Sequence, residues 1–281
     1  MQEKRGRTLS VAIPVYNERD SIFDLLSAVV AVDLETQLIV VDDGSIDGTQ
    51  GIISEFAIDH DLIFIQHEKN RGKGAAVRTA IEHATGDFLI VQDGDLEYDP
   101  NEYGKLMRPI LDGEADVVFG SRRLGQKPPW RRLLTPFYHG VSVLNFLLWL
   151  LYGKKVTDEA TCYKLFRTKD LRRMQLECER FEFCPEVTGK ACRLGLEIKE
   201  VPISYIPRSL EEGKKIGFKD AVEAAVTLWK YRNWKPADLP AAETFPNSQI
   251  SRVDLKGSIL SGPQSPNQGT VVRNDLEHPV T

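Results

Sequence analysis

Phe88-Leu-Ile-Val-Gln-Asp-Gly-Asp-Leu-Glu97 is the stretch of sequence that indicates the fold most directly. Its first half, residues 88–92, is almost wholly apolar and has the length of a buried β-strand. The strand is expected to end directly at Asp93-Gly94-Asp95, so that an acidic cluster begins where the apolar run stops. The stretch therefore predicts a buried strand that carries carboxylates at its carboxyl end.

Apolar runs of the same kind recur on both sides of this stretch and alternate with helical segments. Buried strands are expected over 9–15, 37–41, 61–66 and 116–120. Helices are expected over about 20–32, with Asn17 as the cap, then up to about 59, over 72–84 and after Pro100. Such alternation is typical of an α/β domain with a mostly parallel sheet flanked by helices.

Polar clusters follow four of these strands at the point where each strand ends. They are Tyr16-Asn17-Glu18, Asp42-Asp43, Asp93 with Asp95, and Ser121-Arg122. Ligands of open α/β sheets bind at the carboxyl ends of the strands. The four clusters are therefore expected to converge on one binding site.

The pattern changes beyond about residue 123. A helix is expected over 136–152, a strand over 161–167, a helix over 183–193, a strand over 197–206 and a helix over 217–232. From about residue 236 the chain is rich in Pro, Ser, Gly and Asn, which predicts disorder. The expected organisation is an N-terminal tail (1–8), a single domain (9–235) and a disordered tail (236–281).

The composition excludes several classes of protein. A net charge of −5 over 281 residues argues against nucleic-acid binding, which usually requires a basic surface. The four cysteines form neither a CxxC pair nor a zinc pattern, so we expect reduced thiols in a cytoplasmic protein. The polar start predicts no signal peptide. The longest apolar run, about a dozen residues around 146–152, is shorter than the ~20 residues that span a bilayer.

The carboxylates Asp93, Asp95 and Glu97 stand at alternate positions on a predicted extended turn. Hard oxygen ligands at this spacing suit Mg²⁺ or Mn²⁺. Such an ion would bridge the oxygens of a diphosphate and stabilise charge on a leaving group. The alternative is a solvated acidic turn, and the position at the end of a strand favours the metal.

Two further motifs bear on nucleotide binding. Asp42 follows a strand, as the ribose-binding acid of a dinucleotide fold does, but residues 13–18 contain no glycine where that fold requires GxGxxG. Residues 70–74 (Asn-Arg-Gly-Lys-Gly) lack the spacing of a P-loop. Their glycines allow close approach of the backbone to a ligand, and a plain helix-start turn is the alternative.

Taken together and in order, the motifs resemble those of the family 2 glycosyltransferases with the GT-A fold, a Rossmann-like mostly parallel sheet. The resemblance is closest to the dolichyl- and polyprenyl-phosphate mannosyltransferase-like branch, and it covers about residues 8–235. It is carried by residues 11–18 (Val-Ala-Ile-Pro-Val-Tyr-Asn-Glu), 40–45 (Val-Val-Asp-Asp-Gly-Ser), 72–78 (Gly-Lys-Gly-Ala-Ala-Val-Arg), 93–97, 120–122 (Gly-Ser-Arg), 158–164 (Asp-Glu-Ala-Thr-Cys-Tyr-Lys), 200–205 (Glu-Val-Pro-Ile-Ser-Tyr) and 213–216 (Gly-Lys-Lys-Ile).

The resemblance implies a role for each matching residue. The donor contacts it implies are Pro14, Tyr16, Glu18, Val40, Asp42, Asp93, Gly94, Asp95, Arg122, Arg208 and Lys215. It implies metal ligation by Asp93, Asp95 and Glu97, where relatives often have Gln in place of Glu97, and catalytic roles for Asp95, Arg122 and Lys215. Gly94 stands where Ala is common.

The resemblance also implies the reaction. A hexose would pass, with inversion, from a nucleotide diphosphate sugar of the GDP-mannose or UDP-glucose type to a polyprenyl or dolichyl phosphate. A phosphate acceptor, largely dianionic at pH 7, would need no general base. Two alternatives remain open at this point. One is a soluble family 2 enzyme acting on a saccharide or protein, with Asp158 or Glu186 as base. The other is a non-catalytic nucleotide-sugar-binding module.

A lipid acceptor requires contact with a membrane, and residues 130–155 suit that contact. Phe146-Leu-Leu-Trp-Leu-Leu-Tyr152 is apolar on every face, with basic pairs at 131–132 and 154–155 on either side. This composition is typical of a helix lying on a surface of anionic lipids. We therefore expect a cytoplasmic, peripherally membrane-associated protein, in which any membrane anchor is a separate partner chain. A core helix or an oligomer contact is the alternative.

Overall fold

A computed structural model describes residues 8–125, 136–207, 218–236, 252–253 and 259–260. One sheet joins the described strands in the order β7-β5-β6-β4-β1-β2-β3-β8-β9. The strands are β1 (Leu9–Val15), β2 (Thr36–Asp42), β3 (Leu62–Gln66), β4 (Phe88–Val91), β5 (Val117–Ser121), β6 (Lys164–Arg167), β7 (Ile198–Pro202), β8 (Arg252–Val253) and β9 (Ile259–Leu260).

The central strands run parallel, as the continuous apolar runs predict. β1 pairs in parallel with β2 and β4, β2 with β3, and β5 with β7. β6 is antiparallel to both of its neighbours, β4 and β5. In the β1–β2 register Val15 lies opposite Asp42, so the two strands end at the same level. The polar residues that follow them therefore meet at one edge of the sheet.

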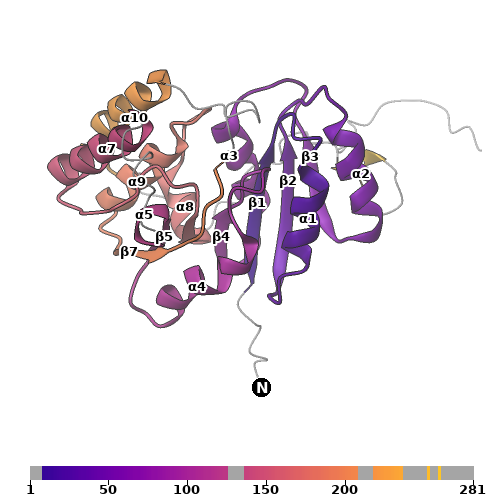
Figure 1. Cartoon of the computed structure of the whole chain (residues 1–281), viewed down its shortest axis with the longest axis horizontal. Coiled ribbons are helices and arrows are strands. Elements are labelled where there is room, and N and C mark those ends of the chain that lie inside the picture. Colours follow the sequence, from indigo (N-terminus) through magenta and orange to yellow (C-terminus); the bar gives the residue numbers. More distant parts are fainter. Residues whose placement is uncertain (1–7, 126–135, 208–217, 237–251, 254–258, 261–281) are drawn as a thin grey trace, which may run out of the picture.

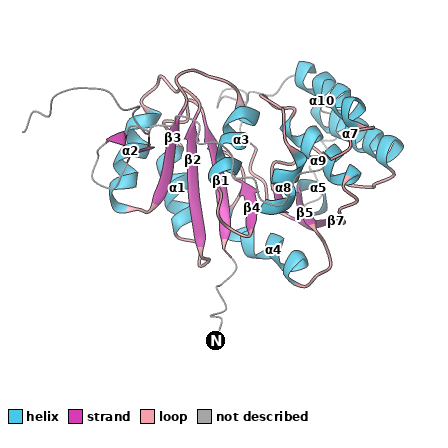
Figure 2. Cartoon of the chain, turned by 180° about the vertical axis from the view of Figure 1, so that it is seen from behind, coloured by secondary structure: helices cyan, strands magenta, loops and turns pink. Residues whose placement is uncertain are grey.

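Helices cover both faces of the sheet (Figures 1 and 2). The helices are α1 (Ile22–Val30), α2 (Thr49–Asp59), α3 (Lys73–His83), the 3₁₀ turn η1 (Pro100–Glu102), α4 (Tyr103–Leu111), α5 (Arg122–Gly125), α7 (Pro136–Tyr152), α8 (Thr168–Met174), α9 (Phe183–Arg193) and α10 (Phe218–Tyr231). Buried side chains of α1, α2 and α4 pack on one face, and those of α3, α8 and α9 pack on the other. The predicted fold class, an α/β sheet flanked by helices, is confirmed.

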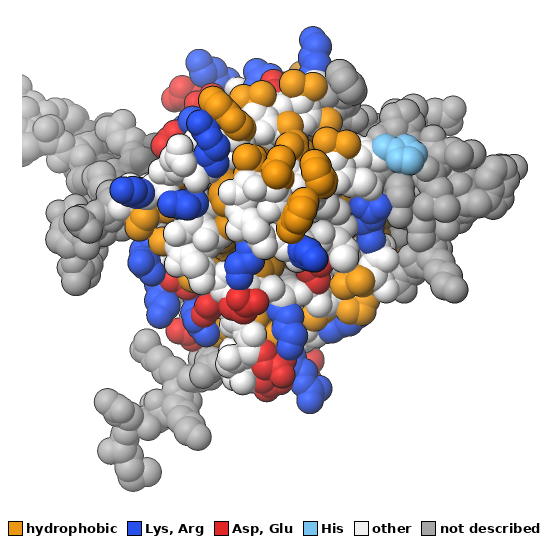
Figure 3. Space-filling view, turned by 90° about the vertical axis from the view of Figure 1, so that its left-hand side faces the viewer, with side chains coloured by type: hydrophobic (Ala, Val, Ile, Leu, Met, Phe, Trp, Pro, Cys, Tyr) orange, Lys and Arg blue, Asp and Glu red, His pale blue; other side chains and the backbone are white. Residues whose placement is uncertain are grey.

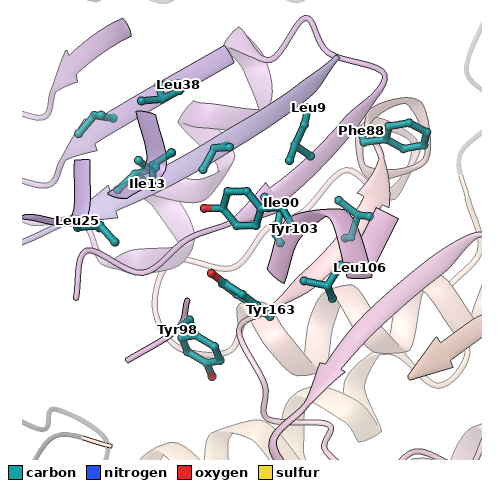
Figure 4. Packing of buried hydrophobic residues seen from close by; sticks show 14 of the residues in the cluster. Leu9, Ile13, Leu25, Leu38, Phe88, Ile90, Tyr98, Tyr103, Leu106 and Tyr163 are labelled. Carbon is teal, nitrogen blue, oxygen red and sulfur yellow. The ribbon is translucent and has the colours of Figure 1, made fainter. Parts of the chain in front are cut away.

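The side chains of β1 point alternately to the two faces of the sheet and so contribute to the cores on both sides. Leu9, Val11 and Ile13 belong to the core on the α1 side, whereas Ala12 belongs to the core on the α3 side. Because both faces are covered, the whole strand is buried, which explains its unbroken apolar sequence. The α1-side core continues to three tyrosines, 98, 103 and 163, whose rings lie close together (Figure 4).

α7 and α10 form a separate helical pair at the β7 end of the molecule (Figure 1). Leu144 and Leu148 of α7 pack against Ala224 and Leu228 of α10 in a small buried cluster. The Tyr152 hydroxyl donates a 2.6 Å hydrogen bond to the carbonyl oxygen of Leu228. The two helices therefore share an inner face, although they lie far apart in the sequence.

Several details differ from the predictions. α1 begins at Ile22, and Asn17 does not cap it. Asn17 has a positive φ of 52°, and its side-chain oxygen accepts a hydrogen bond from the Ile46 backbone N–H at 3.0 Å. The sequence also predicted no helix at Thr168–Met174, where α8 forms. Strands β6 and β7 are shorter than the expected 161–167 and 197–206: β6 begins only at Lys164, and β7 already ends at Pro202.

The terminal predictions are tested only in part. Residues 1–7 lie outside the described residues, and so does most of 236–281. Five residues of the C-terminal segment are described, Pro236 and the four residues of β8 and β9. β8 pairs with β3 at Arg252 and Ile65, and β9 pairs with β8. For the other residues of that segment, disorder stays a prediction.

Candidate active site

A cavity of about 510 Å³ opens at the carboxyl ends of β1 and β4. Eight of the residues predicted for the site line it: Pro14, Tyr16, Glu18, Asp93, Gly94, Asp95, Glu97 and Arg122. Val40 and Asp42 do not line it, because both are fully buried in the strand β2. Arg208 and Lys215 lie outside the described residues.

Polar contacts of Ser21 join the loops that follow β1 and β4. The Ser21 hydroxyl lies 3.1 Å from Glu18 Oε2 and 3.1 Å from the carbonyl oxygen of Gly94. A side chain on Gly94 would meet Glu18 and Pro14 only at ordinary contact distance, 3.4 Å. The backbone there accommodates Ala, which agrees with the small change that the sequence suggested at this position.

Lys73, the first residue of α3, brings a positive charge to the acidic cluster. Its ammonium group donates to Asp93 Oδ1 and lies 3.1 Å from the sulfur of Cys162. Burial would by itself lower the pKa of Lys73, but the neighbouring Asp93 carboxylate raises it above its usual value. The side chain is therefore held as a cation in the wall of the cavity.

Asp43, one residue beyond the predicted Asp42, fixes the turn that precedes α3. Its carboxylate accepts hydrogen bonds from the backbone N–H groups of Arg71 and Gly72, at 3.0 and 2.6 Å. The His67 ring nitrogen Nδ1 lies 2.6 Å from the same carboxylate. This network places residues 70–73 against the cavity, so the 70–74 motif contributes to the site.

Asp42 holds the turn that follows β2 through hydrogen bonds. Its Oδ2 accepts hydrogen bonds from the Ser45 backbone N–H at 3.0 Å and from the Gln50 side chain at 2.8 Å. Its Oδ1 is buried and has no hydrogen-bond partner among the described residues. In this geometry Asp42 shapes the Asp43–Ser45 turn and does not itself face the cavity.

Arg122 reaches the cavity but is already paired. Its side chain donates to both oxygens of Asp158, at 2.8 and 2.7 Å, and to the Tyr98 hydroxyl at 3.2 Å. Its guanidinium group also lies 5.0 Å from the centre of the Tyr205 ring. Burial would raise the pKa of Asp158, but the charge and hydrogen bonds of Arg122 hold it below its usual value. Both Asp158 oxygens are therefore engaged by Arg122.

The other candidate base, Glu186, is not part of the cavity. It is fully buried, and its Oε1 accepts a 2.6 Å hydrogen bond from Lys190 Nζ. Its two oxygens also accept the backbone N–H groups of Glu177 and Cys178, at 2.9 and 2.7 Å. Glu186 therefore lies away from the cavity, and its carboxylate anchors the segment before α9.

The three carboxylates predicted to hold a metal have different partners. Asp93 pairs with Lys73, Asp95 accepts the Glu97 backbone N–H at 3.1 Å, and Glu97 accepts the Tyr205 hydroxyl at 2.8 Å. Across the described ranges no three His, Cys, Asp or Glu side chains are grouped closely enough to hold a metal ion. Within the described residues, the three carboxylates therefore do not form a ready-made metal site.

Sequence reasoning did not single out several residues that line the cavity: Lys73, Tyr98, Cys162, Arg180, Phe181, Tyr205 and Asp220. Lys73, Cys162 and Tyr205 stand inside motifs that were noted, so a signal was present without a role attached to it. Asp220 is the third residue of α10, which brings this helix to the cavity.

Comparison with known proteins agrees with this geometry. The model of the family described as "Glycosyl transferase family 2" matches residues 10–174. This range includes β1 from its second residue, all of β2 to β6, and all the described carboxylates of the cavity except Asp220. The chain is 32% identical over 207 residues to the low-salt glycan biosynthesis hexosyltransferase Agl6 of Haloferax volcanii. That alignment covers 73% of this chain and 49% of Agl6, so the chain spans about half the length of that relative.

Two further relatives align over most of their own length. The UDP-N-acetylglucosamine–dolichyl-phosphate N-acetylglucosaminyltransferase of Methanococcus voltae is 30% identical, over 76% of this chain and 93% of its own. The polyprenol monophosphomannose synthase of Mycolicibacterium smegmatis is 30% identical, over 75% of this chain and 82% of its own.

Among solved structures, glucosyl-3-phosphoglycerate synthase of Mycobacterium tuberculosis, in complex with Mn²⁺, UDP and phosphoglyceric acid, is similar with a TM-score of 0.61. It is 21% identical, and the match covers 88% of this chain and 86% of that one. At this identity the likeness supports the fold alone.

Proposed function

The chain belongs to glycosyl transferase family 2 and is a glycosyltransferase, and on that premise we propose that it transfers a hexose from a nucleotide diphosphate sugar to a polyprenyl phosphate. The acceptor class is supported by relatives named for dolichyl-phosphate and polyprenol substrates. We assign the activity to residues 9–235. The observation that carries the proposal is the cavity itself, in which Asp93, Asp95 and Arg122 meet at the carboxyl ends of parallel strands.

We assign the two ends of the donor to different walls of the cavity. The nucleoside would lie against Pro14, Tyr16 and the turn after β2, which Asp42 holds by accepting a hydrogen bond from the Ser45 backbone N–H. The diphosphate would lie at Asp93, Gly94 and Asp95, beside the cation of Lys73. Arg208 and Lys215 remain candidates for neutralising the diphosphate.

The carboxylates fit a divalent ion of the Mg²⁺ or Mn²⁺ type. Mg²⁺ is usually held by one or two carboxylates together with substrate phosphates, so it does not require a group of three protein ligands, which the described residues lack. Asp95 would be the principal ligand, with Asp93 and Glu97 held beside it by Lys73 and Tyr205. When bound, the ion would stabilise the negative charge that develops on the departing nucleoside diphosphate.

The pairing of the two candidate bases, Asp158 and Glu186, favours an acceptor that needs no base. Asp158 is paired with Arg122, and Glu186 is buried away from the cavity, so neither is available to deprotonate a sugar hydroxyl. A phosphate monoester has a second pKa of about 6 and is largely dianionic at pH 7. It can attack the anomeric carbon directly, opposite the leaving diphosphate, and invert the configuration. The chain's own residues would then position the two substrates and stabilise charge.

We further propose that the outer face of α7 and α10 rests on the membrane that holds the acceptor. This outer face is defined by apolar side chains that are 45–60% exposed, namely Val143, Phe146, Trp149, Leu150, Val222, Val226 and Trp229. Figure 3 shows apolar side chains gathered on this side of the molecule with lysines and arginines around them. An apolar face with lysine and arginine side chains around it suits binding to anionic lipids.

The two interpretations that the sequence left open for α7 concern its two different faces. Leu144 and Leu148 form a core with α10, whereas Phe146 and Leu150 on the other side of α7 are more than half exposed. The helix is thus a core element on one face and a candidate lipid contact on the other. None of the described helices is long and apolar enough to cross a bilayer. The residues 130–135 of the predicted membrane segment lie outside the described residues.

A transfer assay tests the proposed reaction. Purified chain is incubated with a nucleotide sugar, Mg²⁺ or Mn²⁺ and a short-chain polyprenyl phosphate, and the glycolipid product is measured. A thermal-shift screen of GDP- and UDP-sugars first identifies the donor. Asp95→Ala should reduce transfer by about a hundredfold or more, as loss of a group that stabilises transition-state charge does. Full activity of Asp95→Ala in metal-free buffer would overturn the metal assignment.

The same assay distinguishes the alternatives. Transfer to a saccharide or protein but not to polyprenyl phosphate identifies the soluble-acceptor enzyme. Donor binding in the thermal-shift screen, without transfer or hydrolysis under any condition, identifies a non-catalytic nucleotide-sugar-binding module.

A further inference from the structure

Two cysteines from distant parts of the sequence meet in the wall of the cavity. Cys162 lies just before β6, and Cys184 is the second residue of α9. The pKa of each thiol responds to the other thiol, which places the two side chains next to each other. Cys184 also lies 3.4 Å from the carbonyl oxygen of Thr161. Both side chains are only partly buried, and Cys162 lines the cavity.

The pair lies next to a positive charge. Lys73 Nζ is 3.1 Å from the sulfur of Cys162 and donates at the same time to Asp93. Cysteines become reactive when a neighbouring cation stabilises the thiolate and the site is open to reagents. The neighbouring Cys162 thiol lowers the pKa of Cys184, with Lys164 and Lys73 acting in the same direction.

The other two cysteines have different surroundings. Cys178 is buried, and burial together with the nearby Glu186 carboxylate raises the pKa of its thiol. Cys192, near the end of α9, packs beside the α7–α10 cluster, and burial raises its pKa to about 12. Neither lines the cavity. They therefore serve as internal controls for the reactive pair.

We propose that Cys162 and Cys184 are a redox-active thiol pair, that a low-molecular-weight disulfide converts them to an intramolecular disulfide, and that this disulfide weakens donor binding. The pairing rests on the contact between the two thiols at an open cavity wall. The effect on the donor rests on the proposed function, because it requires Asp93 to contact the donor.

Oxidation by glutathione disulfide balances as two thiol–disulfide exchanges. One cysteine thiolate attacks a sulfur of the oxidant, forms a mixed disulfide and releases one glutathione thiolate. The second cysteine thiolate attacks the protein sulfur of that mixed disulfide, closes the Cys162–Cys184 bond and releases the second glutathione. Two electrons pass from the cysteines to the oxidant, and the two thiol protons end on the two glutathione molecules.

The bond changes what Lys73 contacts. A disulfide holds its sulfurs about 2.05 Å apart, closer than a thiol hydrogen bond does. We expect closure of the bond to draw the Cys162 sulfur toward α9, away from the Lys73 ammonium from which it now accepts a hydrogen bond. Lys73 then has Asp93 as its remaining partner among the described residues, and we expect the Lys73–Asp93 pair to shift together in the cavity wall. The diphosphate end of the donor site is thereby altered.

Mass spectrometry of the full chain tests the pairing without any assay of activity. The protein is equilibrated with glutathione disulfide, free thiols are blocked with iodoacetamide, and peptides are mapped. The expected result is a linked peptide that joins Cys162 to Cys184 and disappears after dithiothreitol. Cys178→Ser and Cys192→Ser should leave that peptide unchanged. Both Cys184→Ser and Cys184→Ala should abolish it, so that one poorly folded variant does not decide the result.

Two outcomes overturn the pairing: a glutathione adduct on Cys162 that never resolves to the linked peptide, or a linked peptide that contains Cys178 or Cys192. The proposed effect on donor binding is tested by thermal shift, with the nucleoside diphosphate that stabilises the reduced chain. We expect the oxidised chain to bind it at least tenfold more weakly, with full recovery in dithiothreitol. Equal binding before and after oxidation overturns the effect on the donor and leaves the pairing intact. A failed transfer assay leaves the peptide map unaffected, so the two proposals fail separately.

Discussion

The carboxylate of Asp158 accepts three hydrogen bonds from Arg122, one from its backbone N–H at 2.9 Å and two from its guanidinium group at 2.8 and 2.7 Å. The two residues are 36 positions apart, and their side chains are 1% and 11% exposed. This pair fixes both the start of α5 and the direction in which Arg122 enters the cavity.

Replacement of Asp158 by Asn should destabilise the protein strongly. The change leaves the Arg122 charge buried without its counter-ion, and breaking a buried ion pair costs about 3–5 kcal/mol. Urea unfolding measures the cost. The control is Asp116→Asn at the Arg167 pair, whose side chains are 35% and 31% exposed, where a loss of roughly 0–1 kcal/mol is expected. Equal losses for the two variants would show that burial does not set the strength of the Arg122 pair.

A substitution of Gly72 tests the turn that delivers Lys73. Gly72 has a φ of +99°, and an added Cβ would lie 2.3 Å from the carbonyl oxygen of Glu179. Gly72→Ala should therefore lower the free energy of unfolding by about 1–3 kcal/mol. It should also weaken donor binding, because residues 71–73 shift together. Gly51→Ala in α2 is the matched control: nothing lies within 4 Å of its added Cβ. That change should be neutral or stabilising by up to about 1 kcal/mol.

Glu159 should make the stability depend on pH near neutrality. Burial raises its pKa to about 7, although Lys164 Nζ, 3.9 Å from Oε1, acts in the opposite direction. Between its usual value of 4.5 and about 7, the folded chain holds a proton that the unfolded chain has released. The free energy of unfolding therefore decreases as pH rises through this window, by roughly 1.4 kcal/mol per pH unit.

Comparison with Glu159→Gln isolates this contribution. The variant keeps the shape of the side chain but cannot ionise. Chemical unfolding at pH 5 and pH 7 should show a smaller loss for the variant than for the wild type. Glu200, whose pKa burial also raises, is present in both proteins and does not affect the difference. Parallel pH profiles for the two proteins would mean that Glu159 is ionised throughout.

The outer face of α7 and α10 should bind anionic vesicles. Phe146→Glu combined with Trp229→Glu should reduce co-sedimentation by about tenfold or more, because each large apolar side chain contributes about 1.5–3 kcal/mol when buried. The control is Ile58→Glu on α2, a site that is 65% exposed and lies on another helix. Charges at Leu147 and Leu148 would be a poor test, because Leu148 is fully buried against α10. Equal binding of the wild type and the double variant would exclude this face as the lipid contact.

The sequence predicted the elements whose pattern is strong and local. β1 to β5 and α9 were found at nearly their observed limits, because each carries an unbroken apolar run or a clear helical period. α8 was missed because it is only seven residues long and most of its sequence, Thr-Lys-Asp-Leu-Arg-Arg-Met, is polar. Its helical state depends on burial of Leu171 and Met174 against the sheet, a tertiary contact that no local pattern encodes.

The site was predicted in outline for the same reason. Clusters at strand ends can be placed on one edge from topology alone, and eight of the predicted residues line the cavity. What the sequence could not supply is which charges are paired. Arg122 meets Asp158 and Lys73 meets Asp93 across gaps of 36 and 20 residues. Asn17 does not cap a helix, because its side-chain oxygen accepts a hydrogen bond from the backbone N–H of Ile46, 29 positions away.

The reversed strand β6 determines the order in which this sheet can be completed during synthesis. β1 to β4 find their neighbours within the first 91 residues, so that half of the sheet can pair early. β5 has no described strand neighbour except β6 and β7, both of which emerge from the ribosome much later. Until then β5 exposes two unpaired apolar edges, which are sites of aggregation. We expect nascent chains to depend most on chaperones between the emergence of β5 and the arrival of β6, and folding to be slowed by these long-range pairings.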